Sequence, residues 1–277
     1  MGMSRLGIIQ GRLSPMVDGR IQSFPTEKWR KEFDVAAECG FEIMEWVVDV
    51  DHPELNPLFT TSGRREINIL QQSSGVKVPS VCCDYFMKNP LQQSTIDSFS
   101  SRGLLLEICR LCPEIGIELI ELPLIGEAGL QPDNASDRML SLFETLDPIL
   151  DEFNLKILLE TDLEPEAFNK YLDQIRSDRI QVNYDTGNSA YWGYDAQKEI
   201  SLYGEKIGNI HIKDCTPEDY SVPLGQGNVD FDLSFQKFKE INYQGDFILQ
   251  TVRTNNDIKS AKEFRAFTLS YISKYLV

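Results

Sequence analysis

Short apolar segments alternate with longer amphipathic segments along the chain, and this alternation constrains the fold more than any other feature. Eight apolar segments of strand length are each followed by a segment with helical periodicity. Strands that are repeatedly followed by helices require a parallel sheet with right-handed crossovers. Eight such units in 277 residues favour a closed barrel, which typically takes about 250 residues, over an open doubly wound sheet. The sequence therefore predicts an α/β fold, a single (β/α)8 TIM barrel.

The predicted strands are Leu6–Leu13, Phe41–Val48, Val76–Cys83, Ile117–Leu122, Lys156–Glu160, Gln181–Asp185, Gly208–Lys213 and Asp246–Thr251. The predicted helices are Thr26–Glu38, Ser62–Gln72, Ser100–Leu111, Asn134–Phe153, Glu164–Ile175, Ala196–Tyr203, Leu233–Ile241 and Ile258–Tyr275. We expect Thr26 to cap the first helix, Gly40 to end it and Pro148 to interrupt the fourth. No linker or change in composition divides the chain, so one domain over residues 1–277 is predicted.

Composition excludes several classes of partner. The formal charge is −16 and no run of Lys or Arg offers a basic patch, so a nucleic-acid partner is not expected. No apolar run approaches the roughly 18 residues that would span a bilayer, and the N-terminal segment is too short and too weakly charged for a signal peptide. Among the six cysteines, Cys109 and Cys112 form a pair with zinc-site spacing, but no second pair completes such a site, and all six are interpreted as reduced. A cytoplasmic protein without a membrane partner is predicted.

Side chains that can bind a metal stand at the ends of the last four predicted strands. They are Glu160, Asp185, His211 and Gln250. The C-terminal ends of TIM-barrel strands form the catalytic face, so these side chains are expected to converge there. Taken singly, each is more often a helix cap or a structural group than a ligand. Together, two carboxylates, an imidazole and an amide oxygen suit one divalent ion, which we expect to be Mn²⁺, Mg²⁺, Co²⁺ or Zn²⁺.

Other polar residues near the strand ends are candidates for substrate contact. Side chains alternate along a strand, so His211 and Lys213 share one face while Ile210 and Ile212 point the other way. Lys213 is a candidate catalytic group that holds an anionic substrate group or a developing oxyanion. The candidate substrate-binding residues are Arg12, Glu45, Asp84, Asn188, Trp192, Asp214 and Arg253, with Glu121 a weaker candidate. Any of them can instead be a salt bridge or a supporting group around the site.

Three further segments are expected around the predicted barrel mouth. We expect Gly187–Tyr194 to be an aromatic loop and the glycines of Pro223–Gly227 to permit a close approach to a ligand, although both segments can equally serve packing and turns. The segment Ser14–Pro25 is long for a loop between a strand and its helix. It is a candidate lid or contact between the subunits of a homodimer.

Several motifs carry a resemblance to a known family. The segments L-L-E-T-D, Y-D-T-G-N, N-I-H-I-K-D and P-L-G-Q-G, between Leu158 and Arg253, resemble those of the xylose isomerase-like TIM barrels grouped as sugar phosphate isomerases and epimerases. The resemblance covers essentially the whole chain. It implies that the four strand-end residues bind one divalent metal, which holds the oxygens of an open-chain carbohydrate substrate. It also implies proton transfer through an enediolate, with Glu160 as the base.

The sequence departs from this pattern at the eighth strand, where Gln250 replaces the family's second glutamate. An amide can offer an oxygen to a metal but cannot accept a proton. Epimerisation asks for a base on each face of the substrate, whereas aldose–ketose isomerisation needs only one. Asp84, Glu45 and Asp214 are the candidates for a second base.

Two other functions remain compatible with the sequence. One is a metal-dependent hydrolase or lyase on the same barrel. Related three-zinc endonucleases are disfavoured, because their sites need several histidines and this chain has only His52 and His211. The other is a barrel that binds a sugar without turnover, which the presence of Gln250 makes a real alternative.

Overall fold

Eight parallel strands form a closed barrel in this protein. The computed structural model describes residues 4–93, 100–130 and 134–277. Each strand pairs with the next along the chain, and β1 pairs with β8. The strands are β1 (Leu6–Ile9), β2 (Ile43–Val47), β3 (Ser80–Cys82), β4 (Leu119–Leu124), β5 (Lys156–Thr161), β6 (Ile180–Asp185), β7 (Ile207–Ile212) and β8 (Asp246–Leu249). The predicted (β/α)8 barrel is confirmed.

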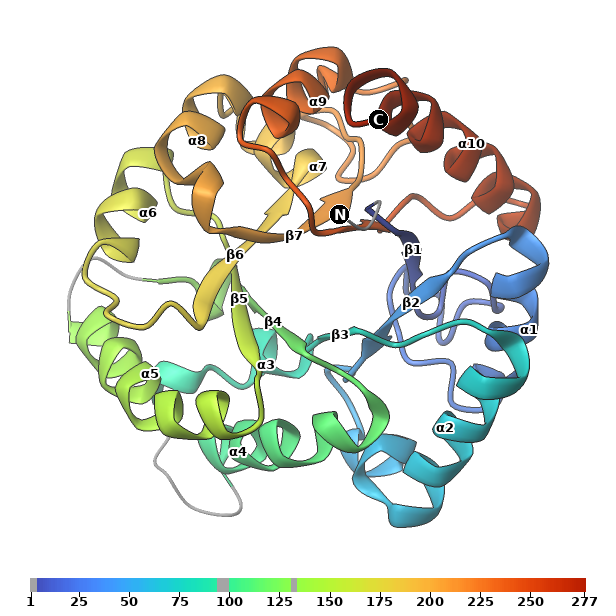
Figure 1. Cartoon of the computed structure of the whole chain (residues 1–277), viewed down its shortest axis with the longest axis horizontal. Coiled ribbons are helices and arrows are strands. Elements are labelled where there is room, and N and C mark those ends of the chain that lie inside the picture. Colours follow the sequence, from blue (N-terminus) through green and yellow to red (C-terminus); the bar gives the residue numbers. More distant parts are fainter. Residues whose placement is uncertain (1–3, 94–99, 131–133) are drawn as a thin grey trace.

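The longer helices form a ring outside the strands, whereas the short helices α3 (Tyr85–Lys88) and α7 (Thr186–Trp192) lie inside that ring, close to the strands (Figure 1). The other helices are α1 (Trp29–Cys39), α2 (Thr61–Ser74), α4 (Ser101–Leu111), α5 (Asn134–Glu152), α6 (Pro165–Leu172), α8 (Ala196–Tyr203), α9 (Phe231–Glu240) and α10 (Asp257–Tyr275). The last helix, α10, contacts both α9 and α1, which closes the ring at the two ends of the sequence (Figure 1).

The start of α1 differs from the prediction. Thr26 does not cap the helix, which begins three residues later at Trp29. The backbone N–H groups of Lys28 and Trp29 both bond to the carbonyl of Pro25, so a backbone turn satisfies the donors that a side-chain cap would have taken. The end of the helix is as predicted, because Gly40 adopts a left-handed conformation with φ 83°.

The predicted interruption at Pro148 is also wrong, since α5 continues through this residue. Proline removes one helical hydrogen bond and strains the preceding turn, at a cost of about 3 kcal/mol. The apolar face of α5 is buried on both sides of it, with Leu146 and Leu150 fully covered. Packing of an amphipathic face contributes most of the stability of helices in proteins, and here it outweighs the proline.

The two faces of the strands have different surroundings. Ile210 and Ile212 on β7 belong to the large apolar core outside the barrel, as their alternation with His211 predicts. Inside, a small apolar cluster that includes Ile43 and Ile248 fills one part of the barrel. Gly7 lies beside this cluster, where an added Cβ would be 2.5 Å from Ile43 Cγ1. The rest of the interior contains buried polar groups, which is unusual for a TIM-barrel core.

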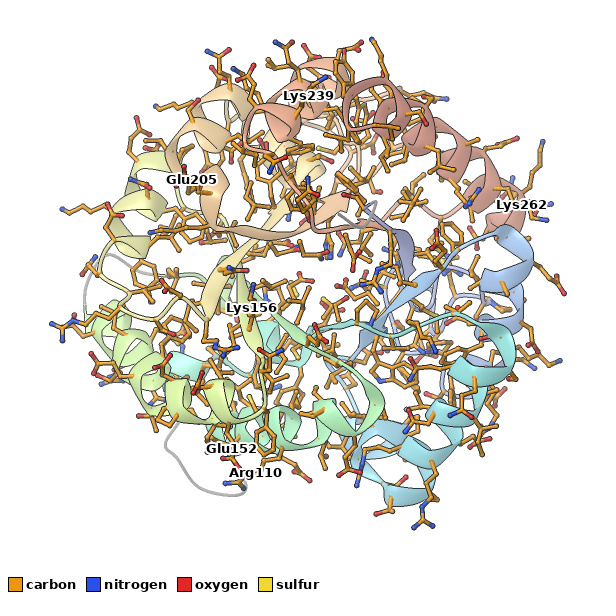
Figure 2. The ribbon with its side chains drawn as sticks, viewed as in Figure 1. Arg110, Glu152, Lys156, Glu205, Lys239 and Lys262 are labelled. Atoms are coloured by element: carbon orange, nitrogen blue, oxygen red, sulfur yellow. The ribbon has the colours of Figure 1, made fainter. Side chains whose placement is uncertain are left out.

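Charged side chains gather on the outside of the helical ring. Figure 2 shows Arg110, Glu152 and Lys262 on this outer surface, and all three are exposed. Across the described parts of the chain, no helix combines the length and apolar character needed to cross a membrane. Residues 1–3, which belong to the segment used for the signal-peptide prediction, lie outside the described residues.

Candidate active site

His211 lies inside the barrel among carboxylates from three other strands. Its Nε2 is 2.7 Å from Oε1 of Glu45 on β2 and 3.2 Å from Oε2 of Glu121 on β4. Its Nδ1 is 3.6 Å from Oε2 of Glu160 on β5. Burial by itself lowers the pKa of His211, but Glu121 and Glu45 outweigh that effect and raise the pKa well above its ordinary value. The imidazole is therefore the centre of a buried acidic cluster.

A set of possible metal ligands converges on the Nδ1 side of this imidazole. Ligand atoms of Glu160, Asp185 and His211 lie within 4.8 Å of one another, and all three side chains are buried. Within the described residues, Nδ1 of His211 has no hydrogen-bond partner, and Oδ2 of Asp185 has none besides its ion pair with Lys213 at 3.5 Å. Buried polar atoms are rarely left without a partner, because that costs their full desolvation. The donor set therefore fits a divalent cation, whose identity the ligand types leave open.

A second group of donors lies on the other side of the ring. Glu45, Glu121 and His211 also offer atoms within 4.8 Å of one another, but there Nε2 already has the Glu45 carboxylate as a partner. A histidine that donates its Nε2–H to a carboxylate presents the lone pair of Nδ1 to a metal. The Nδ1 side is thus the better cation site, and Glu45 orients the ring.

Two amides hold the Glu160 carboxylate. Asn183 Nδ2 donates to Oε2 at 2.7 Å, and Asn188 Nδ2 donates to Oε1 at 2.5 Å. Burial, followed by the charges of Glu121 and Asp185, raises the pKa of Glu160 well above its ordinary value. The side chain is therefore fixed in direction and has an increased affinity for a proton, as a general base requires.

A short helix follows Asp185, where the sequence predicted an aromatic loop. Asp185 Oδ1 accepts the backbone N–H of Asn188 at 2.8 Å and caps α7. Gly193, with φ 72°, ends the helix. A capping aspartate and a terminal glycine with seven residues between them are signals of a helix that the loop prediction overlooked. The helix directs the Asn188 side chain toward Glu160.

Lys213 is buried beside the same helix. Its Nζ donates to Asn188 Oδ1 at 2.5 Å and lies 3.5 Å from Asp185 Oδ2. The ammonium also lies 3.7 Å from the centre of the Tyr220 ring, a cation–π contact. An added Cβ at Gly187 would be 2.7 Å from Lys213 Cγ. Glycine at this position therefore leaves the space that Lys213 occupies.

A cavity of about 310 Å³ opens at the C-terminal ends of the strands. Among the residues that line it are Arg12, Asp84, Glu121, Glu160, Lys213 and Gln250. Gln250 Nε2 is 3.5 Å from Oε1 of Gln22. Arg12 bonds to the carbonyls of Thr251 and Ile21. Burial, followed by the charge of Arg253, lowers the pKa of Arg12 to about 10.

Five predicted substrate-binding residues do not line this cavity, and one of them, Asn188, instead donates to Glu160. Glu45 is completely buried against His211. Asp214 accepts the backbone N–H groups of Cys215, Gly225, Gly227 and Val229. Arg253 donates to the carbonyls of Gly11 and Ser14. Trp192, at the end of α7, contacts the Tyr194 ring. Asp214 and Arg253 thus hold the loops around the mouth.

Three residues that the sequence analysis did not single out contribute to the site. Asn183 precedes Asp185 by two positions, so strand alternation is the signal that places it on the inward face. Gln22 lies in the long loop after β1 and lines the cavity, as does Tyr220 in the segment after β7. Nothing in the local sequence of Gln22 or Tyr220 distinguishes them from ordinary loop residues.

Residues 33–270 match the sequence pattern of the family described as xylose isomerase-like TIM barrel. The chain belongs to this family. The family predicted from the strand-end motifs is therefore confirmed. Among its curated relatives, L-ribulose-5-phosphate 3-epimerase UlaE of Salmonella heidelberg is 26% identical over 239 residues, which cover 81% of this chain and 82% of the relative.

Solved structures of other proteins share the fold. D-allulose 3-epimerase from Methylomonas sp., in complex with D-allulose, superposes with a TM-score of 0.74 at 15% identity and covers 97% of each chain. The IolI protein with a bound zinc atom superposes with a TM-score of 0.73 at 16% identity, over 98% of this chain and 99% of that one. The curated relative UlaE is named as a sugar epimerase, which does not favour hydrolase or lyase chemistry.

Proposed function

We propose that this protein is a metal-assisted isomerase or epimerase that acts on a sugar or sugar phosphate through an enediolate. One observation carries the proposal: Glu160, Asp185 and the unpartnered Nδ1 of His211 converge at the C-terminal end of the barrel. The epimerase names of the relatives support the same class of reaction.

The chain's own residues would perform the proton transfer. A divalent cation held by the three side chains would supply Lewis-acid stabilisation of the negative charge that develops on the substrate oxygens. Glu160 takes the proton from the carbon beside the carbonyl. Asn183 and Asn188 keep its carboxylate in one orientation. Lys213 lies close enough to Asn188 and the cavity to stabilise a developing oxyanion.

Features of the cavity support a polar, open-chain substrate. The cavity has a volume of about 310 Å³ and is lined by guanidinium, ammonium, amide and carboxylate groups. These groups can form hydrogen bonds with the many hydroxyls of a sugar. Arg12 and Lys213 also place two positive charges along the cavity, and these suit an anionic substituent such as a phosphate. L-ribulose 5-phosphate and D-allulose are therefore sensible first substrates.

Solvent deuterium exchange tests the proposal. The protein is incubated in deuterated buffer with L-ribulose 5-phosphate, D-allulose and related ketoses and aldoses, with Mn²⁺, Mg²⁺, Co²⁺ or Zn²⁺ or with a chelator. We expect metal-dependent deuterium incorporation at a carbon beside the carbonyl, read by NMR. No exchange with any sugar, together with a melting temperature that a chelator does not change, would contradict the proposal and favour a non-catalytic barrel.

A further inference from the structure

The cavity needs a second proton-transfer group if the proposed reaction inverts a carbon. In an inversion the proton leaves one face of the carbon and another proton arrives on the opposite face. Gln250 lines the cavity but cannot exchange a proton through its amide. The inference that follows rests on the proposed function and concerns which residue supplies the second group.

Most carboxylates around the site are unsuited to this role. Glu121 lies close to Glu160, since its charge contributes to the raised pKa of Glu160, and it is therefore on the same side of the cavity. Glu45 and Asp214 do not reach the cavity. Asp49 lines it but is paired with Arg20 at 3.0 Å and accepts the backbone N–H of Phe24.

Asp84 has a different position. It follows β3 and lines the cavity, and it is buried but slightly more exposed than Glu160, at 9% against 6%. Its Oδ2 accepts Nε2 of Gln22 at 2.8 Å, and its Oδ1 accepts the Cys82 thiol at 3.2 Å. The carboxylate is therefore turned toward the loop after β1. Glu160 is instead held from β6 and α7 by Asn183 and Asn188.

We propose that Asp84 is the second acid–base residue of the site and exchanges a proton with the substrate on the face opposite Glu160. Glu160 takes the C–H proton, and the electron pair of that bond enters the enediolate. The enediolate pair then forms a new C–H bond with the proton of the Asp84 carboxyl group. Asp84 is left as a carboxylate and Glu160 as an acid, and the reverse reaction or exchange with solvent restores both.

The surroundings of Asp84 suit this exchange. Burial raises its pKa to about 6, while the bonds from Gln22 and Cys82 act in the opposite direction. The charged groups around it are Arg12 from the loop after β1, Asp49 after β2 and Glu121 on β4. Both protonation states of Asp84 are therefore populated near neutral pH, as an acid–base group requires.

The test compares Asp84→Asn with the wild type on L-ribulose 5-phosphate in deuterated buffer, with Mn²⁺ present. Two quantities are measured: deuterium in recovered substrate and the amount of inverted product. We expect Asp84→Asn to lower inversion by about 100-fold or more, whereas exchange by Glu160 stays within a few-fold. In the wild type, inversion that starts with Glu160 should decline above about pH 6, because the Asp84 donor loses its proton.

Asp51→Asn is the matched control, since Asp51 is an exposed aspartate near the same mouth and its replacement should change neither quantity. Circular dichroism and melting establish that each variant folds. Wild-type-like inversion by Asp84→Asn would overturn the assignment of Asp84. So would loss of exchange together with inversion in the folded variant, or a wild-type enzyme that exchanges deuterium without inverting any carbon. An inactive wild type would instead contradict the proposed function itself.

Discussion

Glu45 and His211 form a buried contact across the barrel, with Oε1 of the carboxylate 2.7 Å from Nε2 of the ring. Both side chains are completely buried, and Ser80 donates to the other oxygen of Glu45 at 2.7 Å. This contact fixes which ring nitrogen faces Glu160 and Asp185. Glu45, which does not line the cavity, thus determines that His211 offers Nδ1 to the candidate metal site.

Replacement of Glu45 by Gln should weaken metal binding without removing a ligand. Loss of a carboxylate behind a ligating histidine typically lowers metal affinity by about 10–100-fold. Titration calorimetry with Mn²⁺ measures the change. Glu42→Gln, at an exposed position near the start of the same strand, is the control and should bind as the wild type does. Equal affinity in the two variants would show that Glu45 does not orient the ligand.

Replacement of Glu160 by Gln should abolish deuterium exchange. The amide keeps the shape of the side chain but cannot take a proton, so the rate should fall by roughly 10²–10⁴. The exchange assay with L-ribulose 5-phosphate measures this loss, and circular dichroism checks the fold. Retained exchange in the folded variant would remove Glu160 as the base.

Addition of a divalent metal should raise the melting temperature. A ligand that binds only the folded state stabilises it by about 2.7 kcal/mol when its concentration is 100 times the Kd. Differential scanning fluorimetry with and without Mn²⁺ measures the shift. Asp185→Asn removes one charged donor and should reduce the shift, whereas an equal shift in this variant would place the binding elsewhere.

Replacement of Asp214 by Asn should loosen the loop after β7. The carboxylate accepts backbone N–H groups from Gly225 and Gly227 at 2.9 Å each. Because an amide group has only one oxygen to accept them, we expect a loss of about 1–3 kcal/mol. Urea unfolding measures the loss, and faster hydrogen exchange at Gly225 and Gly227 would locate it. Unchanged protection would contradict the role of Asp214 in holding this loop.

Glu32 should make stability depend on pH. Burial raises its pKa to about 7 in the folded state, although the N–H groups of Gly11 and Leu13 act in the opposite direction. The folded state therefore holds this proton more tightly than the unfolded chain. The stabilisation is complete below about pH 4.5 and is lost as the pH rises to 7, a change of roughly 3 kcal/mol.

The variant Glu32→Gln isolates this effect, because its side chain does not titrate. Urea unfolding of both proteins at pH 5 and pH 8 gives the difference in their pH dependence. We expect the wild type to lose more stability than the variant over this range. Parallel losses in the two proteins would assign the pH dependence to other buried acids.

Local sequence patterns were sufficient for the architecture. Strand and helix periods predict eight repeated units, and closure into a barrel follows from their number. The predicted start of α1 was wrong because a backbone turn at Pro25 replaces the expected side-chain cap. The predicted interruption of α5 was wrong because packing around Pro148 outweighs the local effect of the proline. The helix after Asp185 was overlooked although its cap and its terminal glycine were visible in the sequence.

The sequence by itself determined the barrel, the family and the candidate donors Glu160, Asp185 and His211, because strand ends and alternation are local properties. Only the tertiary structure decided which polar residues share the cavity. Asp214 follows Lys213 directly, yet its carboxylate is enclosed by backbone N–H groups, whereas Asp84 lines the cavity beside Gln22. That difference depends on hydrogen-bond partners from distant segments, which no local pattern specifies.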